Sequence, residues 1–280
     1  MFSAVVVLFN PNSLVISNIS SFADSVACIY VIDNSSFSNE NLFYNVSYKN
    51  KLKYVFNNEN KGIATALNIG CQLAIEAGME WVLTMDQDST FLNFSSEVIS
   101  FILNNDSKAA LYYPNYIIEG QVYDKYIKEA KKPIVVMTSG NLINLSVYEK
   151  VLGFEDKLFI DYVDIDYCLK LKKLGYKIEN LPMLKLKHEL GQSFYKSFFS
   201  YKAIVTNHSS LRRYYITRNR LYVRKKYRKV SAVFYQAEKR IFINDILKII
   251  FFEKNKFSKF KSVIRGYLDY KNNKYGIYNK

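Results

Sequence analysis

Apolar runs of strand length alternate with helix-length segments through the first two thirds of the chain, and no other feature of the sequence constrains the fold as strongly. The runs of strand length are Ala4–Phe9, Cys28–Asp33, Leu52–Phe56, Trp81–Met85 and Ala109–Pro114. Helices are expected between them, notably over residues 64–77, where Gly78 gives a stop signal, and over residues 95–103. This alternation predicts an α/β fold with a mixed, mostly parallel sheet and helices on both faces.

The pattern becomes looser after Pro133. We expect a strand, a turn at the sequence TSGNL and a short helix over residues 146–152. A longer helix over residues 163–174 and a strand over residues 176–181 follow, after which the chain reaches His188. The remainder is helix-compatible and contains neither an internal repeat nor a linker, so we expect it to pack against the main domain.

The positive charge of the chain is concentrated at one end. The chain has 39 Lys and Arg residues and 25 Asp and Glu residues. Residues 211–280 contain 20 of the basic and 4 of the acidic residues, which leaves 19 basic and 21 acidic residues in residues 1–210. The net charge of +14 therefore belongs to the last quarter of the chain. We expect a near-neutral catalytic domain over residues 1–210 and a basic, aromatic-rich helical tail over residues 211–280.

The cysteines and the N-terminus bear on the compartment. Cys28, Cys71 and Cys168 are far apart and form no paired motif, which fits a reducing cytoplasm better than a disulfide framework or a zinc site. The first apolar run is short and no basic region precedes it, so it predicts a strand and not a signal peptide. No segment approaches the roughly 20 apolar residues that span a bilayer.

Polar side chains follow three of the predicted strands. Asn10 comes after VVVLF, Asp33 ends CIYVID, and Asp86-Gln87-Asp88 follows WVLTM. Because the carboxyl ends of parallel strands share one edge of a sheet, these side chains are suited to a nucleotide site. Asp and Asn also favour turns for purely local reasons, and this explanation stays open for Asp33.

The sequence Asp86-Gln87-Asp88 predicts a metal site. Two carboxylates separated by one residue at a strand end can both face a diphosphate, one of them through a hard divalent cation. Mg²⁺ and Mn²⁺ prefer oxygen ligands and share them with substrate phosphates. Such a pair also occurs by chance, and it is the position after an apolar strand that favours function here.

The order of six motifs resembles the inverting glycosyltransferase family 2. They are VLFNP, VIDNSS, NENKGIATALNIG, MDQDS, TSGNL and FIDYVDIDYCLKLKKLGY, and the resemblance covers residues 1 to about 225. It is strongest for the rhamnosyltransferase-like branch, which builds O-antigens and other cell-surface polysaccharides. The resemblance implies a GT-A-type, Rossmann-like fold and transfer of a sugar from a sugar nucleotide.

The resemblance also implies roles on the donor side of the site. The nucleotide-sugar pocket would be formed by Asn10, Asp33, Asn60, Lys61, Gly62 and Asp86. Asp88 would be the metal ligand, and His188 would complete the metal or diphosphate site. Lys61-Gly62 could equally be a simple helix-entry turn, and a lone histidine is more often structural.

Three acids at the start of the helix over residues 163–174 are candidates for the catalytic base. Asp161, Asp164 and Asp166 lie close together, and clustered carboxylates raise one another's pKa, as a base that deprotonates a sugar hydroxyl requires. The resemblance aligns Asp164 with the base. Val163 stands where the family has a first acid, so the division of roles between Asp161 and Asp164 stays open. Acids also stabilise a helix N-terminus without any catalytic role.

Acceptor contacts are expected from two regions. Ser139, Gly140 and Asn141 resemble the family's acceptor-side turn, although an ordinary tight turn explains them equally well. Arg218-Asn219 matches an Arg-Asn pair of the rhamnosyltransferase-like branch and is expected, with Asp166, on the acceptor-diphosphate side. Basic and aromatic residues from Arg212 onward, followed by the apolar run from Ile241, suit an anionic membrane surface.

We therefore expect a metal-dependent transferase at the cytoplasmic face of a bacterial plasma membrane, peripherally attached. The resemblance favours dTDP-L-rhamnose as donor, a polyprenyl-diphosphate-linked glycan as acceptor and Mg²⁺ or Mn²⁺ as the ion. UDP-hexoses and UDP-galactofuranose remain alternative donors. The contrasting hypotheses are an inactive sugar-nucleotide-binding module and a nucleic-acid-binding protein; no nucleic-acid partner is expected, because the chain lacks the corresponding motifs.

Overall fold

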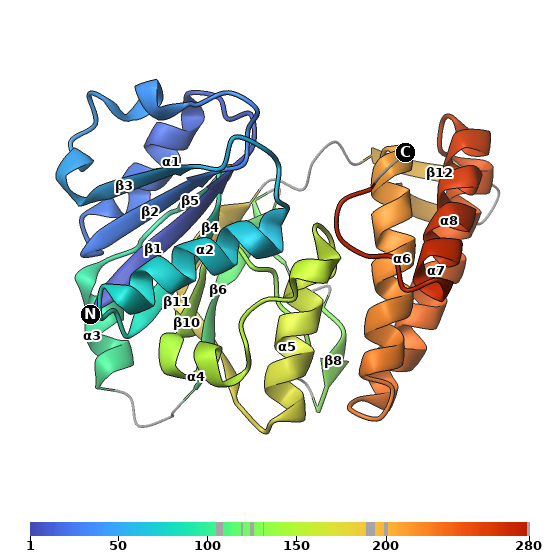
Figure 1. Cartoon of the computed structure of the whole chain (residues 1–280). Coiled ribbons are helices and arrows are strands. Elements are labelled where there is room, and N and C mark those ends of the chain that lie inside the picture. The colour runs from blue at the N-terminus through green and yellow to red at the C-terminus, as the bar shows by residue number, and fades with distance from the viewer. Residues whose placement is uncertain are drawn as a thin grey trace.

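A twisted sheet with helices on both faces forms the first part of the protein, and a bundle of three helices forms the last (Figure 1). The computed structural model describes residues 1–104, 109–118, 120–123, 126–130, 132–188, 194–198 and 201–278. The sheet has nine strands, and eight of them lie in the order β3-β2-β1-β4-β10-β6-β11-β5, with β7 paired to β6.

The strands of the sheet point predominantly in one direction. Their bounds are β1 Phe2–Leu8, β2 Cys28–Asp33, β3 Leu52–Phe56, β4 Trp81–Asp86, β5 Ser89–Phe91, β6 Leu111–Ile118, β7 Gln121–Val122, β10 Asn141–Asn144 and β11 Ile178–His188. The strands β1 to β4 are mutually parallel, and β6 is parallel to β11. Because β10 runs antiparallel to both β4 and β6, these two strands share a direction. Six strands thus bring their carboxyl ends to one edge, where ligands bind in such sheets.

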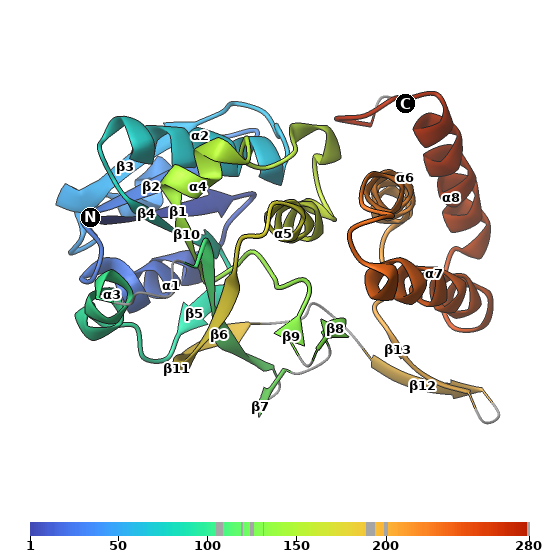
Figure 2. The same cartoon turned by 90° about the horizontal axis from the view of Figure 1, so that it is seen from below.

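Helices cover the two faces of the sheet (Figure 2). The helices α2 (Ile63–Glu76) and α4 (Leu145–Lys150) lie on one face, and α1 (Leu14–Ala23) and α3 (Ser96–Leu103) lie on the other. All seven residues of β1 are buried between these layers, which explains its continuous apolar sequence. The helix α5 (Val163–Lys173) lies between the sheet and the helical tail.

Several shorter elements complete the fold. They are the 3₁₀ turns η1 (Glu40–Phe43), η2 (Lys49–Lys51) and η3 (Asp156–Leu158), and the hairpin pairs β8 (Lys128–Glu129) with β9 (Lys132–Pro133) and β12 (Phe194–Phe198) with β13 (Tyr201–Val205).

The predicted α/β class is confirmed, with local differences. The expected strands over residues 28–33 and 52–56 have the observed bounds, and α2 is shifted by one residue from the expected helix. The strand expected directly after Pro133 is wrong, because residues 134–137 form no ladder. The strand β10 instead begins inside the TSGNL sequence, and the short strand β5 was not predicted.

The tail consists of α6 (Ser210–Lys226), α7 (Ala232–Phe251) and α8 (Lys256–Lys271), so the helical prediction is confirmed. The helix α6 lies between the sheet domain and the other two helices (Figure 2). Buried ion pairs join Arg213 to Glu253 and Arg220 to Glu238 within this bundle. Among the described residues, no helix has the length and apolar character needed to cross a membrane.

Gly70 provides a test of the packing between α2 and the sheet. A Cβ at this position would lie 2.4 Å from Cγ1 of Val5, which is fully buried in β1. We expect Gly70→Ala to lower the free energy of unfolding by about 1–3 kcal/mol from overpacking, although alanine favours a helix by about 1 kcal/mol over glycine. Urea unfolding measures this, with Gln72→Ala on the exposed side of α2 as control. A stabilised Gly70→Ala protein would contradict the packing.

Candidate active site

A cleft of about 730 Å³ lies between the carboxyl edge of the sheet and the helical tail. The ends of β1, β4 and β11 form one wall, and the start of α5 with one side of α6 forms the other. Acidic residues come from both walls, among them Asp86 and Asp88 from the sheet side and Asp161 and Asp164 from the α5 side. The cleft therefore joins two acidic groups that are far apart in the sequence.

The turn after β4 is fixed by the side chain of its middle residue. Gln87 Oε1 accepts a hydrogen bond from the backbone N of Phe9 at 2.8 Å, and Gln87 Nε2 donates to the Phe9 carbonyl at 3.2 Å. This pair of hydrogen bonds ties the turn to the end of β1. Asp86 and Asp88, on either side of Gln87, both line the cleft.

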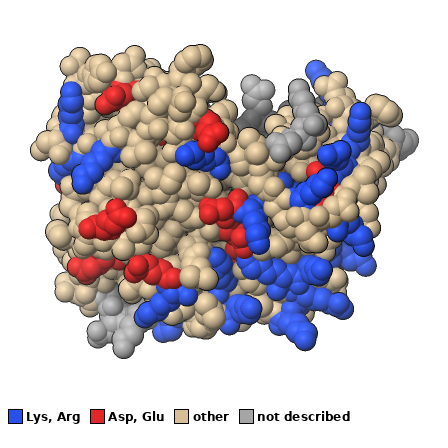
Figure 3. All heavy atoms as spheres, in the orientation of Figure 1, with Lys and Arg blue, Asp and Glu red and all other residues tan. Residues whose placement is uncertain are grey.

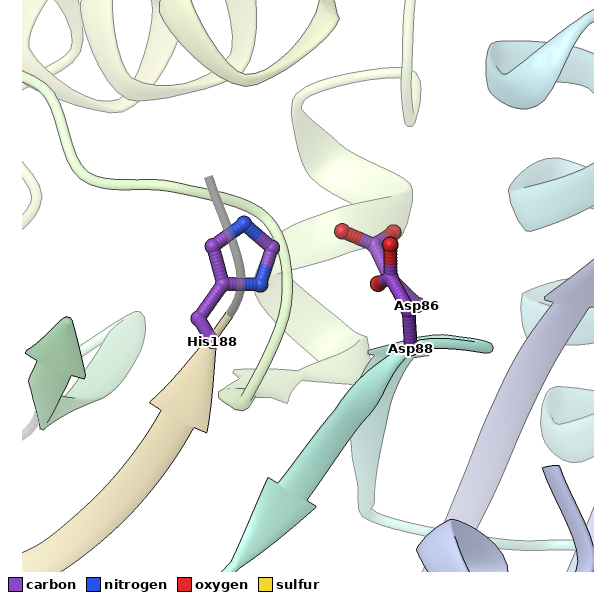
Figure 4. A group of neighbouring side chains, drawn as sticks. All are labelled: Asp86, Asp88 and His188. Atoms are coloured by element: carbon purple, nitrogen blue, oxygen red, sulfur yellow. The ribbon is translucent and has the colours of Figure 1, made fainter. Parts of the chain in front are cut away.

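Asp86, Asp88 and His188 form a group that can hold a metal ion. One ligand atom from each lies within 4.8 Å of the others. Figure 4 shows the two carboxylates and the imidazole extending from the strand ends into the same space. The Nδ1 atom of His188 lies 2.8 Å from Ser89 Oγ, a contact that orients the ring. Two carboxylates and one imidazole suit Mn²⁺ and Mg²⁺, so these residues fit the predicted divalent cation.

Electrostatic crowding is strongest at Asp86. Desolvation, together with the neighbouring Asp88, raises the pKa of Asp86 to about 7. A cation held between the two carboxylates would offset this repulsion. The backbone N of Asp86 donates to Ser139 Oγ at 3.1 Å, so the TSGNL segment supports the end of β4 from behind.

Gly140 and Asn141, which follow Ser139 in the TSGNL segment, also support the site from outside the cleft. Gly140 has φ +82°, and a Cβ there would lie 2.9 Å from Pro114. Asn141 is buried, and its side chain donates to the Met137 carbonyl at 2.7 Å. Ser139, Gly140 and Asn141 are absent from the lining of the cleft, so they position Asp86 from outside it.

Asp33 ends β2 and is fully buried. Burial alone would raise its pKa, but hydrogen bonds from Ser35, Tyr54 and Asn39 lower the pKa below the usual value. The acid is therefore an ionised acceptor inside a polar network. It does not line the cleft, whereas its neighbour Asn34 does, and Asn34 donates to the Gly62 carbonyl at 3.0 Å.

The loop before α2 lies at the mouth of the same cleft. Asn60 and Gly62 line it, and Asn60 Oδ1 accepts from the backbone N of Gly62 at 2.9 Å. Gly62 has φ +85° and is packed so tightly against Phe159 that a Cβ would lie 2.6 Å from the Phe159 carbonyl oxygen. Lys61 is exposed and is not part of the lining. Asn10, also exposed, has φ 47° and donates its backbone N–H to Ser35 Oγ.

The acids on the α5 side have different partners. Asp161 forms an ion pair with Arg212 and accepts three hydrogen bonds from it, with the shortest N–O distance at 3.0 Å. Asp164 has no cation bound to it among the described residues, and desolvation raises its pKa to about 6. A carboxylate with this pKa accepts a proton at neutral pH more readily than an ordinary aspartate.

Asp166, Arg218 and Asn219 lie outside the cleft, which corrects the expectation that they face an acceptor diphosphate. All three side chains are fully buried. Asp166 is paired with Lys226 at 2.8 Å, and the donors of Arg218 and Asn219 are bound mainly to backbone carbonyls. Direct contact with an acceptor does not fit this placement, because these side chains are fully buried and do not line the cleft.

The sequence analysis missed the part of the cleft that the tail forms. His208, Arg212, Arg213, Ile216 and Arg220 all line it. The last four recur at helical spacing on one face of α6, a signal that the sequence contains. The charge of Arg213 and Arg220 is matched by Glu253, Glu238 and Asp245. His208, which had no motif around it, has its pKa lowered to about 4 by desolvation and by Arg212 and Arg213.

Solved structures with a similar fold include complexes with sugar nucleotides. They include S. aureus TarS 1-349 in complex with UDP-GlcNAc, with a TM-score of 0.56 and 15% identity over 96% of this chain and 80% of that chain. The mannosyltransferase PcManGT from Pyrobaculum calidifontis, in complex with GDP-Man and Mn²⁺, has a TM-score of 0.56 and 11% identity over 98% and 87% of the two chains. At such identities the likeness concerns the fold, which is that of the GT-A glycosyltransferases.

A third structure with this fold is GalNAc-T7 with UDP, GalNAc and Mn²⁺, with a TM-score of 0.56 and 14% identity. The match covers 80% of this chain but 47% of that one, so the chain spans about half the length of that protein. These likenesses define the fold of the protein as that of GT-A architecture.

Sequence comparisons identify the family. The model of glycosyl transferase family 2 matches residues 3–151, more than half of the chain. The dTDP-rhamnosyl transferase RfbF of Shigella flexneri is 30% identical over 233 residues, which are 77% of this chain and 77% of that protein. The chain belongs to glycosyltransferase family 2, and the predicted likeness to its rhamnosyltransferases is confirmed.

Proposed function

We propose that the protein transfers L-rhamnose from dTDP-rhamnose to a lipid-linked glycan, with inversion at the anomeric carbon. The observation that carries this proposal is the cleft itself, in which a group suited to a divalent cation faces an acid with a raised pKa. The first group suits a nucleoside diphosphate, and the second suits a sugar hydroxyl. A single displacement between them needs no covalent intermediate on the protein.

The donor occupies the sheet side of the cleft in this proposal. Asp88 and His188, with Asp86 beside them, would hold Mg²⁺ or Mn²⁺, which supplies positive charge that stabilises the departing diphosphate. Asn60 and Gly62 line the nucleotide in this proposal, whereas Asn10, Asp33 and Lys61 lie outside the lining of the cleft. Asp33 contributes through the network that fixes Ser35 and Asn39, since its own carboxylate is buried.

Asp164 acts as the general base of the proposed reaction. Its carboxylate takes the proton of the acceptor hydroxyl while that oxygen forms a bond to the anomeric carbon. The bond from this carbon to the diphosphate oxygen breaks at the same time, and the nucleoside diphosphate leaves with the electron pair. Asp161, which is paired with Arg212 beside the base, orients the acceptor in this proposal.

The donor proposal is supported by the likeness to the Shigella flexneri dTDP-rhamnosyl transferase. UDP-hexoses and UDP-galactofuranose are the competing donors. We expect the largest rise in melting temperature with dTDP-rhamnose plus Mn²⁺, because binding to the folded state raises stability by mass action. A shift that is larger with a UDP-sugar would change the donor, and no metal-dependent shift with any sugar nucleotide would contradict the transferase proposal.

Replacing the base tests the mechanism. We expect Asp164→Asn to lower kcat by about 100- to 10,000-fold while the affinity for the donor is retained. In the unmodified protein Asp164 must be deprotonated to act, and its pKa is raised to about 6, so kcat/KM should be level above this pH and fall as pH drops below it.

Asp24→Asn, an exposed position away from the cleft, is the control for that substitution. Near-normal turnover by Asp164→Asn, or a level profile down to about pH 5, would contradict the assigned base.

We further propose that the acceptor is a polyprenyl-diphosphate-linked glycan of a bacterial surface polysaccharide, and that the tail rests on the inner, anionic face of the plasma membrane. The outer side of α8 supports this location. Phe257, Ile264 and Leu268 recur at helical spacing and are 86%, 58% and 47% exposed. Lys261 and Lys271 fall on the same side of the helix.

Charge favours an anionic bilayer over a second copy of the chain on this side of α8. Two copies packed through it would bring their Lys261 and Lys271 ammonium groups together, whereas anionic headgroups attract them at about 1 kcal/mol for each basic residue. Figure 3 shows further Lys and Arg side chains gathered over the lower part of the tail. The stretch from Arg212, which we expected to face the membrane, is instead largely buried as α6.

Flotation with liposomes tests this surface. We expect the protein to float with phosphatidylglycerol-containing liposomes and not with neutral ones, and Phe257→Glu together with Ile264→Glu to abolish flotation, because two carboxylates would replace the apolar contacts. Phe37→Glu is the matched control, since Phe37 is 84% exposed on the sheet domain. Unchanged flotation of the double variant would exclude α8 as the docking surface.

A further inference from the structure

Arg218 is the largest fully buried side chain of the described structure, and it has no acidic partner there. Its guanidinium donates to the Gly276 carbonyl at 2.7 Å, to the Lys157 carbonyl at 3.2 Å and to the Leu158 carbonyl at 3.1 Å. Burying an unpaired charge is costly unless hydrogen bonds compensate it. A salt bridge therefore does not explain why this arginine is buried.

Asn219, the next residue, binds the same segment of backbone. Its side-chain amide donates to the carbonyls of Leu158, Ile160 and Asp161 at 2.8, 2.7 and 3.0 Å. The Asn219 oxygen accepts from Arg218 Nε at 3.0 Å, so the two side chains are locked together. From the tail, these two side chains thus bind the loop over residues 157–161. This loop leads into the N-terminus of α5.

That loop has an unfavourable backbone conformation. Phe159 has φ 65° and ψ −65°, and the N–H of Ile160 donates to the Leu158 carbonyl at 2.8 Å, which makes a tight γ-turn. Asp161 and Tyr162 follow with φ 60° and 68°. Residues other than glycine rarely adopt these conformations, and such conformations persist only where the surroundings enforce them.

The loop is held from two sides. On the sheet side, the Phe159 carbonyl accepts from the Ile63 N–H at 2.7 Å, at the start of α2. On the tail side, Arg218 and Asn219 take the remaining carbonyls, and the Phe159 ring stacks on Tyr215 with centroids 5.2 Å apart. Three residues of positive φ, within four consecutive positions, therefore lie between two rigid elements.

The segment after α8 closes the arrangement. The Gly276 N–H donates to the Lys157 carbonyl at 2.9 Å while its own carbonyl accepts from Arg218. The Tyr275 ring lies over the Arg218 guanidinium, and the Tyr278 N–H donates to the Tyr215 hydroxyl at 2.8 Å. Arg218, Asn219 and Gly276 thus all bind the main chain of this loop.

We propose that Arg218 and Asn219 are positioning residues that hold the loop over residues 157–161, and with it Asp161 and Asp164, in the geometry required for transfer. The inference rests on the proposed function, because it needs Asp164 as the base. It assigns to the tail a part in the chemical step that is separate from membrane contact. The candidate metal ligands on the donor side, Asp86, Asp88 and His188, come instead from the sheet edge.

The test separates turnover from donor binding. We expect Arg218→Lys and Asn219→Ala to lower kcat by about 100-fold, because small displacements of catalytic groups have effects of this size. The Kd for the sugar nucleotide that gives the largest metal-dependent thermal shift should change by less than about threefold. Lysine keeps the charge of arginine but not its planar set of donors, so we expect that the retained charge will not preserve turnover in Arg218→Lys.

A matched control separates positioning from loss of stability. Lys259 is also buried in the tail and binds Asn207 and Glu253, away from the loop. Lys259→Met should lower the melting temperature and leave kcat unchanged at a temperature where the protein is folded. Should the first two variants not fold, Gly276→Pro removes the N–H that binds the Lys157 carbonyl and also displaces the segment after α8, because proline cannot adopt the φ of +78° at this position. It is expected to lower kcat by about 10-fold with the donor Kd unchanged.

Two results would overturn the proposal. One is a kcat within about threefold of the unmodified protein in the folded Arg218 and Asn219 variants, or in Gly276→Pro if they do not fold. The other is a donor Kd that weakens in parallel with kcat. If Asp164→Asn itself kept normal turnover, the proposed base would be wrong, and that failure is distinct from a failure of the positioning role.

Discussion

The common direction of six strands is the constraint on which the rest of the molecule depends. Because β4 and β11 end at the same edge, Asp86 and Asp88 meet His188, about a hundred positions further along the chain. Gln87 fixes the turn to β1, and Ser139, just before β10, supports the end of β4. The site is thus a product of strand order, with Asp86 and Asp88 placed by the end of β4 and the turn after it, and His188 by the end of β11.

The second half of the site depends on the tail. Phe159 and its neighbours hold a strained backbone, and the side chains of Arg218 and Asn219 are bound to that backbone. The same helix contributes Arg212 to the cleft beside Asp161. A division into a catalytic domain over residues 1–210 and a separate membrane-binding tail describes the charge distribution well, but the tail also takes part in building the cleft.

The sequence predicted those features that depend on local pattern. Continuous apolar runs identified β2 and β3 with their observed bounds, and the acids after β4 were placed at the strand edge. Features that depend on tertiary context were not predicted. The sequence Arg-Asn does not show whether the two side chains contact a ligand or are buried against the protein's own backbone. The difference depends on whether backbone carbonyls of residues 157–161 surround the two side chains in the fold.

The incorrect prediction of a strand after Pro133 also has its cause in tertiary context. Residues 134–137 have the apolar, β-branched composition of a strand, yet β10 lies further along the chain and pairs with β4 and β6 in their place. No motif surrounds His208 in the sequence, yet it lines the cleft together with residues of α6. The family assignment did not depend on any of these details, since it rests on the order of the motifs.

Anomalous diffraction from crystals grown with Mn²⁺ and a nucleoside diphosphate tests the central claim most directly. The account predicts one strong manganese peak bounded by Asp88, His188 and Asp86, with the diphosphate on the side of the cleft opposite Asp164. A manganese ion bound elsewhere, or a nucleotide seated outside this cleft with the three residues unoccupied, would contradict it.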